Sequence, residues 1–147
     1  MTRTLEEILG KRAIAAVRRP VEKAGGLPGV AYTSQEFFEL EQEQFFPRTW
    51  MGVGFECDIP KAGDAMPIMV GKLPLILVRN KQGEIKAFHN VCRHRASMVL
   101  TQPEKGLTSL TCPYHAWAYT REGHLRYARG TQTMVNPACV MFDPSNE

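Results

Sequence analysis

Four residues that can bind metal stand in two short, related motifs. Cys92-Arg93-His94 forms C-x-H, and after seventeen intervening residues Cys112-Pro113-Tyr114-His115 forms C-x-x-H. Two sulfur and two nitrogen ligands suit a 2Fe-2S centre in which two Cys hold one iron and two His hold the other. The same set suits a tetrahedral structural zinc ion, so the ligand types alone leave both chemistries open.

The order of these ligands favours the iron-sulfur centre. Structural zinc motifs usually keep like ligands together, whereas Cys and His alternate in both halves here. Strands are predicted near 84–88 and 107–111, each shortly before one of the motifs. Both motifs should therefore lie on neighbouring loops at one end of a sheet.

The remaining histidines and cysteines are interpreted as ordinary residues. His89 and His124 are expected to be packed or exposed side chains, not ligands, and Cys57 and Cys139 are expected to be free thiols. This follows the usual rule that thiols in a reducing compartment stay unpaired unless they bind metal.

Beyond Trp50 the sequence consists of short apolar runs separated by Gly, Pro and Asn, which indicates a small antiparallel β structure. Asn80–Gly83 and Thr120–Gly123 should form hairpin turns, with glycine at the position of positive φ. The predicted strands lie at 51–55, 65–70, 75–79, 84–88, 107–111, 117–120 and 124–127.

The N-terminal part predicts amphipathic helices. Thr4-Leu5-Glu6-Glu7 is a capping box that should begin a helix ending before Pro20. Thr33-Ser34-Gln35-Glu36 repeats the signal ahead of a second, acidic helix that Pro47 closes, and the glycine-rich stretch 25–29 is a linker. Both helices are interpreted as packing elements. The predicted division is residues 1–30, a helix and linker, and residues 31–147, a cofactor domain.

Composition limits the functional classes further. The 147 residues carry a formal net charge of +3, with 44% hydrophobic residues, which suits one ordinary core. No apolar run approaches the roughly 18 residues that cross a bilayer, and no secretory segment is recognisable, so a cytoplasmic protein without a membrane partner is expected. Nucleic acid is not expected as a partner, because the basic residues are not interleaved with a stacking platform of aromatics.

The two motifs and their surroundings resemble a known family. Ala87–Arg95 and Cys112–Trp117 look like the cluster loops of the Rieske non-haem iron oxygenases, the large terminal subunits of ring-hydroxylating dioxygenases and their monooxygenase relatives. Weaker matches extend the likeness to Tyr32-Thr33, Phe46–Trp50, Gly63-Asp64, Leu77–Arg79, Gly123–Leu125 and Phe142–Ser145. The resemblance implies a mostly β fold with N-terminal helices, a Rieske-type small antiparallel β-sandwich or barrel with two cluster-binding loops at one end.

The resemblance also implies the roles of the ligands. Cys92 and Cys112 would hold the inner iron of a Rieske-type 2Fe-2S cluster, and His94 and His115 the outer iron, which faces solvent. None of these residues would be catalytic in the sense of touching a substrate.

This sequence departs from the family at two loop positions. The family usually has Gly where this chain has Ala96 and Ala116. If either position requires positive φ, alanine would strain the loop by about 1 kcal/mol or more. Tyr114 and Trp117 are expected to shield the cluster from water.

The expected function is single-electron transfer, as the N-terminal part of an oxygenase large subunit. The chain contains no D-x₂-H-x₃₋₄-H pattern for a mononuclear catalytic iron, so no catalytic domain is expected. Phe142–Ser145 resembles a point before the end of the family's Rieske region, so the domain is expected to be C-terminally incomplete. Whether the chain is itself an enzyme is left open. A stand-alone Rieske ferredoxin is the alternative, although the two leading helices favour the first interpretation, and a zinc-binding structural module is more distant.

The expected partners are a reductase or ferredoxin and further copies of the chain. Arg93 and Arg95 alternate with the ligands Cys92 and His94, so an acidic redox partner should dock there. Arg95 could equally brace the loop through internal hydrogen bonds. The amphipathic helices predict a homo-oligomer.

Overall fold

The structure is a computed structural model that describes residues 3–128. The chain forms two compact units, Met1–Trp50 and Met51–Glu147, which are described separately. This division falls later in the chain than the predicted boundary after residue 30. Cys139 and Phe142–Ser145 lie outside the described residues. Along residues 3–128 there is no helix with the length and apolar character needed to cross a membrane.

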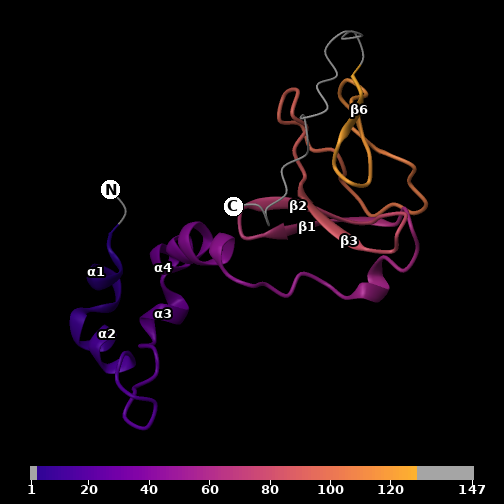
Figure 1. Cartoon of the computed structure of the whole chain (residues 1–147). Coiled ribbons are helices and arrows are strands. Elements are labelled where there is room, and N and C mark those ends of the chain that lie inside the picture. Colours follow the sequence, from indigo (N-terminus) through magenta and orange to yellow (C-terminus); the bar gives the residue numbers. More distant parts are fainter. Residues whose placement is uncertain (1–2, 129–147) are drawn as a thin grey trace. The chain divides into compact units, whose positions relative to one another are not determined.

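The first unit is helical (Figure 1). Thr4 caps the first helix as predicted: the Glu7 N–H donates to Thr4 Oγ1 at 3.3 Å, and the Thr4 N–H donates to Glu7 Oε2 at 2.7 Å. Ser34 caps a later helix by accepting the Phe37 N–H at 3.2 Å. The helices are α1 (Leu5–Leu9), α2 (Lys11–Val17), α3 (Val30–Thr33) and α4 (Gln35–Leu40), followed by a π-helical turn (Glu41–Phe45) and a 3-10 turn (Phe46–Arg48).

The prediction of one continuous first helix is wrong. Gly10 separates α1 from α2 with φ of 82°, a left-handed conformation that interrupts the helical hydrogen bonds and that glycine adopts at little cost. The second helix does end near Pro47, which occupies the first turn of the 3-10 segment.

The second unit contains two small antiparallel sheets, so the predicted fold class is confirmed (Figure 1). The first sheet has the order β1-β2-β3 and the second β4-β5-β6. The strands are β1 (Ala65–Val70), β2 (Leu73–Arg79), β3 (Ile85–His89), β4 (Leu110–Thr111), β5 (Ala118–Tyr119) and β6 (Leu125–Tyr127). Both predicted hairpin turns are present, at Asn80–Gly83 and Thr120–Gly123.

The predicted strand at 51–55 is wrong, because within residues 3–128 this segment pairs with no strand. Its backbone is used in a tight turn instead: the Phe55 N–H donates to the Asp58 carboxylate at 2.8 Å, and the Asp58 N–H donates to the Phe55 carbonyl at 3.0 Å. Gly54 lies against the side chain of Met66, on the first sheet. The segment is nevertheless mostly exposed, with Phe55 79% exposed, so its apolar residues do not form a buried strand.

One core joins the two sheets and includes both motif cysteines. Tyr119 and Ile76 are fully buried, and Cys92 and Cys112 are each 2% exposed. The other members come from β1, β2, β3, β4, β6 and the loops: Ala65, Val78, Phe88, Val99, Leu100, Leu110, Leu125 and Ala128. Both thiols are therefore held in an apolar interior.

The two hairpin turns give a matched pair of glycine substitutions. Gly123 has φ of 87°, and an added methyl would lie 2.6 Å from Cε1 of the buried Phe88, whereas Gly83 has φ of 85° and open space around it. Gly83→Ala should lower the free energy of unfolding by about 1 kcal/mol, the cost of the left-handed backbone alone. Gly123→Ala should lower it by about 2–4 kcal/mol, because the clash adds to that cost. Equal losses in chemical denaturation would contradict this account of the core.

Candidate functional site

The first motif lies on a closed loop that follows β3. The Ala96 N–H donates to the Cys92 carbonyl at 2.9 Å, and the Cys92 N–H donates to the Ser97 carbonyl at 2.8 Å. These two bonds close the chain around His94, which is exposed at the tip of the loop. The cysteine is thus at the buried base and the histidine at the exposed end.

The second motif has the same loop, between β4 and β5. The Ala116 N–H donates to the Cys112 carbonyl at 3.0 Å, and the Cys112 N–H donates to the Trp117 carbonyl at 2.8 Å. His115 is partly buried here. Two loops of one design therefore present a buried sulfur and an outer imidazole each.

Both loops require a left-handed alanine. Ala96 has φ of 54° and Ala116 has φ of 58°, the only non-glycine residues with positive φ in residues 3–128. Each alanine costs about 1–2 kcal/mol relative to glycine in this conformation. Both positions therefore require the positive φ that the departure from glycine made costly, and the loops keep their shape at the expense of local strain.

The two thiols lie in contact with each other in the core. Burial raises the pKa of Cys92, and the neighbouring Cys112 raises it further, although Tyr119 acts in the opposite direction. Burial also acts to raise the pKa of Cys112, but hydrogen bonds from the backbone N–H groups of Tyr114 and His115, together with Cys92 and Ser97, hold that pKa below its usual value. The site therefore already contains N–H donors for a negatively charged sulfur.

The two imidazoles form a second pair. Their ring centroids are 4.7 Å apart at an interplanar angle of 68°. Trp117 stacks on His94 at 4.8 Å and 10°, and the Tyr114 ring lies 3.8 Å from that of His115. Desolvation lowers the pKa of His94, assisted by His115 and Arg95, which favours the neutral imidazole that binds metal.

His115 Nδ1 is the single buried side-chain nitrogen or oxygen in residues 3–128 without a hydrogen-bond partner. Buried polar atoms are nearly always paired, so an unpaired ring nitrogen beside a second imidazole calls for an explanation such as a metal ion. His94, His115, Pro113, Tyr114 and Ala116 line a surface hollow of about 350 Å³. No three His, Cys, Asp or Glu side chains in the described part of the chain are arranged to share one metal ion.

Tyr119 is a site residue that the sequence did not reveal. Its phenol oxygen lies 3.4 Å from Cys92 Sγ and accepts the Arg93 N–H at 3.0 Å. A metal-bound thiolate has no proton, so in that state the phenol would be the donor to sulfur. From the sequence Tyr119 is only a residue of a predicted strand. Its contact with Cys92 lies 27 positions away along the chain, so no local pattern signals it.

Asn90 is a second such residue, and it fixes the first loop from inside. The fully buried amide oxygen accepts the N–H groups of Val99 and Leu100, both at 2.9 Å. The amide nitrogen donates to the Leu100 carbonyl at 2.6 Å. One side chain therefore ties the start of the loop to its end.

The remaining predicted residues lie elsewhere. Cys57 is an exposed free thiol, as predicted. His89 is partly buried at the end of β3, and His124 is exposed in the turn before β6.

Comparison with known proteins identifies the fold family. Residues 49–138 match the family model of the Rieske [2Fe-2S] domain. The chain is 35% identical over 122 residues to the glycine betaine monooxygenase oxygenase subunit of Pseudomonas aeruginosa, and 42% identical over 104 residues to the biphenyl 2,3-dioxygenase subunit alpha of Rhodococcus jostii. These matches cover 83% and 71% of this chain.

A solved structure of a related protein has a similar fold. The apo form of a quaternary ammonium Rieske monooxygenase superposes with a TM-score of 0.71 at 31% identity, over 82% of this chain and 36% of that one. The chain spans 28% of the glycine betaine monooxygenase subunit and 23% of the biphenyl dioxygenase subunit. On the family match and these relatives, the chain belongs to the Rieske [2Fe-2S] domain family and carries a cluster of the Rieske type.

Proposed function

We propose that Cys92, Cys112, His94 and His115 hold the Rieske cluster and that the chain passes single electrons as the N-terminal part of an oxygenase subunit. The bound cluster supplies a centre that accepts and releases one electron at a time. The observation that carries the proposal is the separation of ligands by type, with the two thiols together in the core and the two imidazoles together at the loop tips.

The residues present fit such a cluster. Two thiols side by side can hold one iron, and two imidazoles side by side can hold the other. The unpaired Nδ1 of His115 would gain a partner, and the N–H groups of Tyr114 and His115 would stabilise negative charge at the Cys112 sulfur. The buried apolar surround at Cys92 and Cys112 keeps water from the sulfur side.

The alternatives fit less well. Structural zinc needs four donors converging on one ion, whereas here like donors are paired. A stand-alone ferredoxin would fit the second unit but leaves the helical first unit without a role. The similarity to oxygenase and alpha subunits over 71–83% of this chain supports the oxygenase interpretation.

The proposal includes a redox partner, a reductase or ferredoxin with an acidic surface, and a cytoplasmic location. Arg93 and Arg95 are exposed beside His94, and neither side chain forms an ion pair or hydrogen bond among residues 3–128. This favours docking over bracing for both. The three described cysteines are free thiols, which suits a reducing compartment. We also propose that the chain forms a homo-oligomer.

The ligand assignment predicts the metal content of matched histidine variants. Purified wild-type protein should contain about two iron and two sulfide per chain and give a Rieske-type EPR signal when reduced. His115→Asn should lose most of this iron, because the outer iron would lack one of its imidazoles. His124→Asn is the control and should retain both iron and signal, since the His124 side chain is exposed in the turn between β5 and β6, outside both motif loops. Colourless protein loaded with zinc would remove the cluster proposal altogether.

The Tyr119 contact predicts a change in reduction potential. Hydrogen bonds to cluster sulfur stabilise the reduced, more negative state. Tyr119→Phe should therefore lower the reduction potential by on the order of 50 mV. This shift corresponds to part of the free energy of one charge-assisted hydrogen bond. Tyr127→Phe removes an exposed phenol from the same sheet and should leave the potential unchanged. Protein-film voltammetry measures both, and an unaltered potential in Tyr119→Phe would contradict the assigned donor.

The docking proposal predicts charge-dependent reduction kinetics. Complementary charge raises association rates by about ten-fold or more at low salt, and the gain falls as salt screens it. Arg93→Glu should slow reduction by the partner, flatten its salt dependence and leave the visible spectrum intact. Arg126→Glu reverses an exposed charge on β6 and serves as the control. Stopped-flow reduction that is equally fast in both variants at low salt would exclude this surface as the electron entry.

A further inference from the structure

The two motif loops close with the same backbone bond at equivalent residues. In the first loop the Ser97 carbonyl accepts the Cys92 N–H, and in the second loop the Trp117 carbonyl accepts the Cys112 N–H, both at 2.8 Å. The first loop thus ends on a small hydroxyl side chain and the second on a large indole. The side chain of Trp117 therefore has a reach that its counterpart in the first loop lacks.

The Trp117 side chain crosses from the second loop to the first. It is partly buried and packs against the core of the second unit. Its ring also stacks on the imidazole of His94, with ring centroids 4.8 Å apart and an interplanar angle of 10°. Aromatic rings at this separation attract each other beyond the effect of the area that they bury. One side chain therefore connects the core to a proposed ligand in the other loop.

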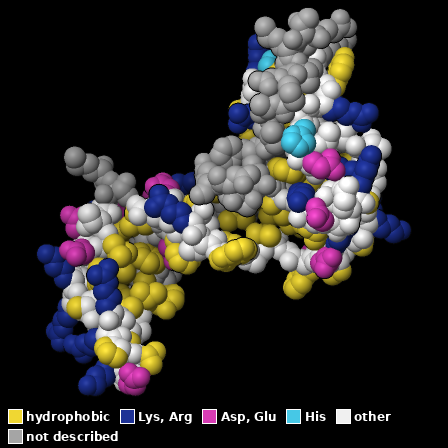
Figure 2. Space-filling model, in the orientation of Figure 1, with side chains coloured by type: hydrophobic (Ala, Val, Ile, Leu, Met, Phe, Trp, Pro, Cys, Tyr) yellow, Lys and Arg dark blue, Asp and Glu magenta, His cyan; other side chains and the backbone are white. Residues whose placement is uncertain are grey.

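The ring of His94 has few other contacts that could fix its plane. Its side chain is exposed, and Figure 2 shows histidine side chains at the surface of the second unit. Among residues 3–128 the ring forms no hydrogen bond, and its contact with His115 is edge-on at 68°. The torsion that turns an imidazole about its Cβ–Cγ bond has broad energy wells. A nearly coplanar indole restricts this rotation, because turning the imidazole would drive its edge into the indole face.

Histidines that bind metal usually have their second ring nitrogen held by a carboxylate or a backbone carbonyl, which fixes the orientation of the ring. Within the described part of the chain His94 has no such partner, and the stacked indole of Trp117 is the contact that can replace it. His115 is supported from within its own loop, since the ring of Tyr114 lies 3.8 Å from it at an angle of 40°. The two imidazoles are thus supported by two different aromatic residues of the second loop.

We propose that Trp117 is the positioning residue of His94 and holds the imidazole plane in the orientation in which the ring binds the outer iron. This inference rests on the proposed ligand assignment. Shielding the cluster from water needs only an apolar side chain of sufficient size, whereas positioning needs a flat ring. Because ring orientation and basicity tune a bound metal, the second loop thereby helps to set the properties of a ligand that the first loop carries.

Pulsed EPR of the full-length, cluster-loaded protein in its reduced state tests this role, because it measures the coupling of the electron spin to each ligand nitrogen. Trp117→Met keeps an apolar side chain but removes the flat ring, so it should shift or broaden one of the two couplings and leave the other unchanged. It should also lose iron to a chelator about ten-fold faster than wild type. Trp117→Leu is a second variant without a ring and should behave in the same way. Trp117→Phe retains a ring and should restore both couplings.

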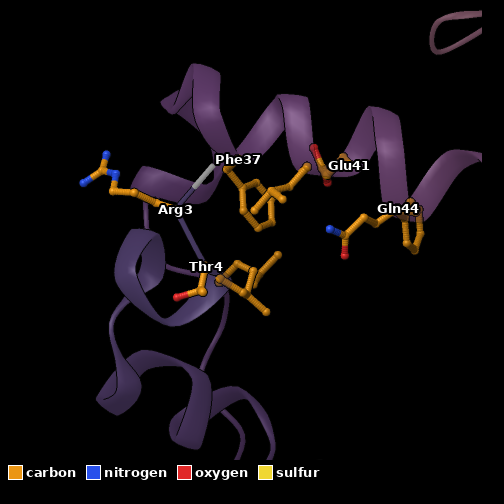
Figure 3. A pocket seen from close by; sticks show the side chains of 9 residues that line it. Arg3, Thr4, Phe37, Glu41 and Gln44 are labelled. Atoms are coloured by element: carbon orange, nitrogen blue, oxygen red, sulfur yellow. The ribbon is translucent and has the colours of Figure 1, made fainter. Parts of the chain in front are cut away.

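Two further substitutions serve as controls. Trp50→Met makes the same change at the only other tryptophan, which is fully exposed and lies outside the hollow between α1 and α4 (Figure 3). It should alter neither coupling. Tyr114→Leu removes the ring beside His115 and should change the coupling that Trp117→Met leaves intact.

These measurements separate positioning from shielding. The proposal is overturned if the Met and Phe variants of Trp117 behave alike, or if Trp117→Met changes both couplings or neither. It is also overturned if Tyr114→Leu and Trp117→Met change the same coupling. A wild-type cluster with fewer than two coupled nitrogens would instead overturn the ligand assignment, and this inference with it, so the two failures are distinguishable.

Discussion

The burial of two neighbouring thiols is the constraint on which the second unit depends. Cys92 and Cys112 are members of the same core as Ile76, Phe88 and Tyr119, so the two sheets meet at the sulfurs. Two thiolates in an apolar interior would repel each other and lose hydration, which is costly unless a cation or N–H donors compensate. The structure supplies the donors from the backbone of the second loop, and a cluster iron would supply the cation. Core packing and the proposed cluster thus both place the two thiols side by side next to backbone N–H donors.

The loops show how that constraint is met locally. Each cysteine both donates its N–H and accepts an N–H through its carbonyl across one short turn, so the sulfur is fixed by backbone bonds on either side. Closing the turn brings Ala96 and Ala116 into left-handed conformations that alanine resists. Strain of this kind persists only where the surroundings determine the conformation, and here Asn90, Tyr119 and the core do so. The left-handed alanines are therefore a consequence of the backbone bonds that fix Cys92 and Cys112.

The sequence predicted what depends on neighbours in the chain and missed what depends on distant contacts. The ligand motifs, the Thr4 capping box and both hairpin turns are local patterns, and the long strands β1, β2 and β3 have enough residues for their composition to be informative. The strands β4 and β5 are shorter than predicted: only two residue pairs, Leu110 with Tyr119 and Thr111 with Ala118, join them before the second motif loop begins. The segment 51–55 has the composition of a strand but is mostly exposed and leads into the turn at Phe55–Asp58, and composition does not distinguish the two. Tyr119 and Asn90 act across 27 and 10 positions, which no local pattern encodes.

The two units differ in what completes them. In the second unit the proposed cluster would satisfy the unpaired His115 Nδ1 and the buried thiols, and the free energy of binding it would add directly to the stability of the fold. The first unit offers almost no buried side chain of its own among residues 3–50, and its short helices are below the length at which helices are stable in isolation. Cap bonds at Thr4 and Ser34 and partly buried side chains therefore take the place of an enclosed core in this unit. An unpaired ring nitrogen beside buried thiols calls for a cofactor, whereas short helices without an enclosed core depend on their caps and on the cover of their partly exposed apolar side chains.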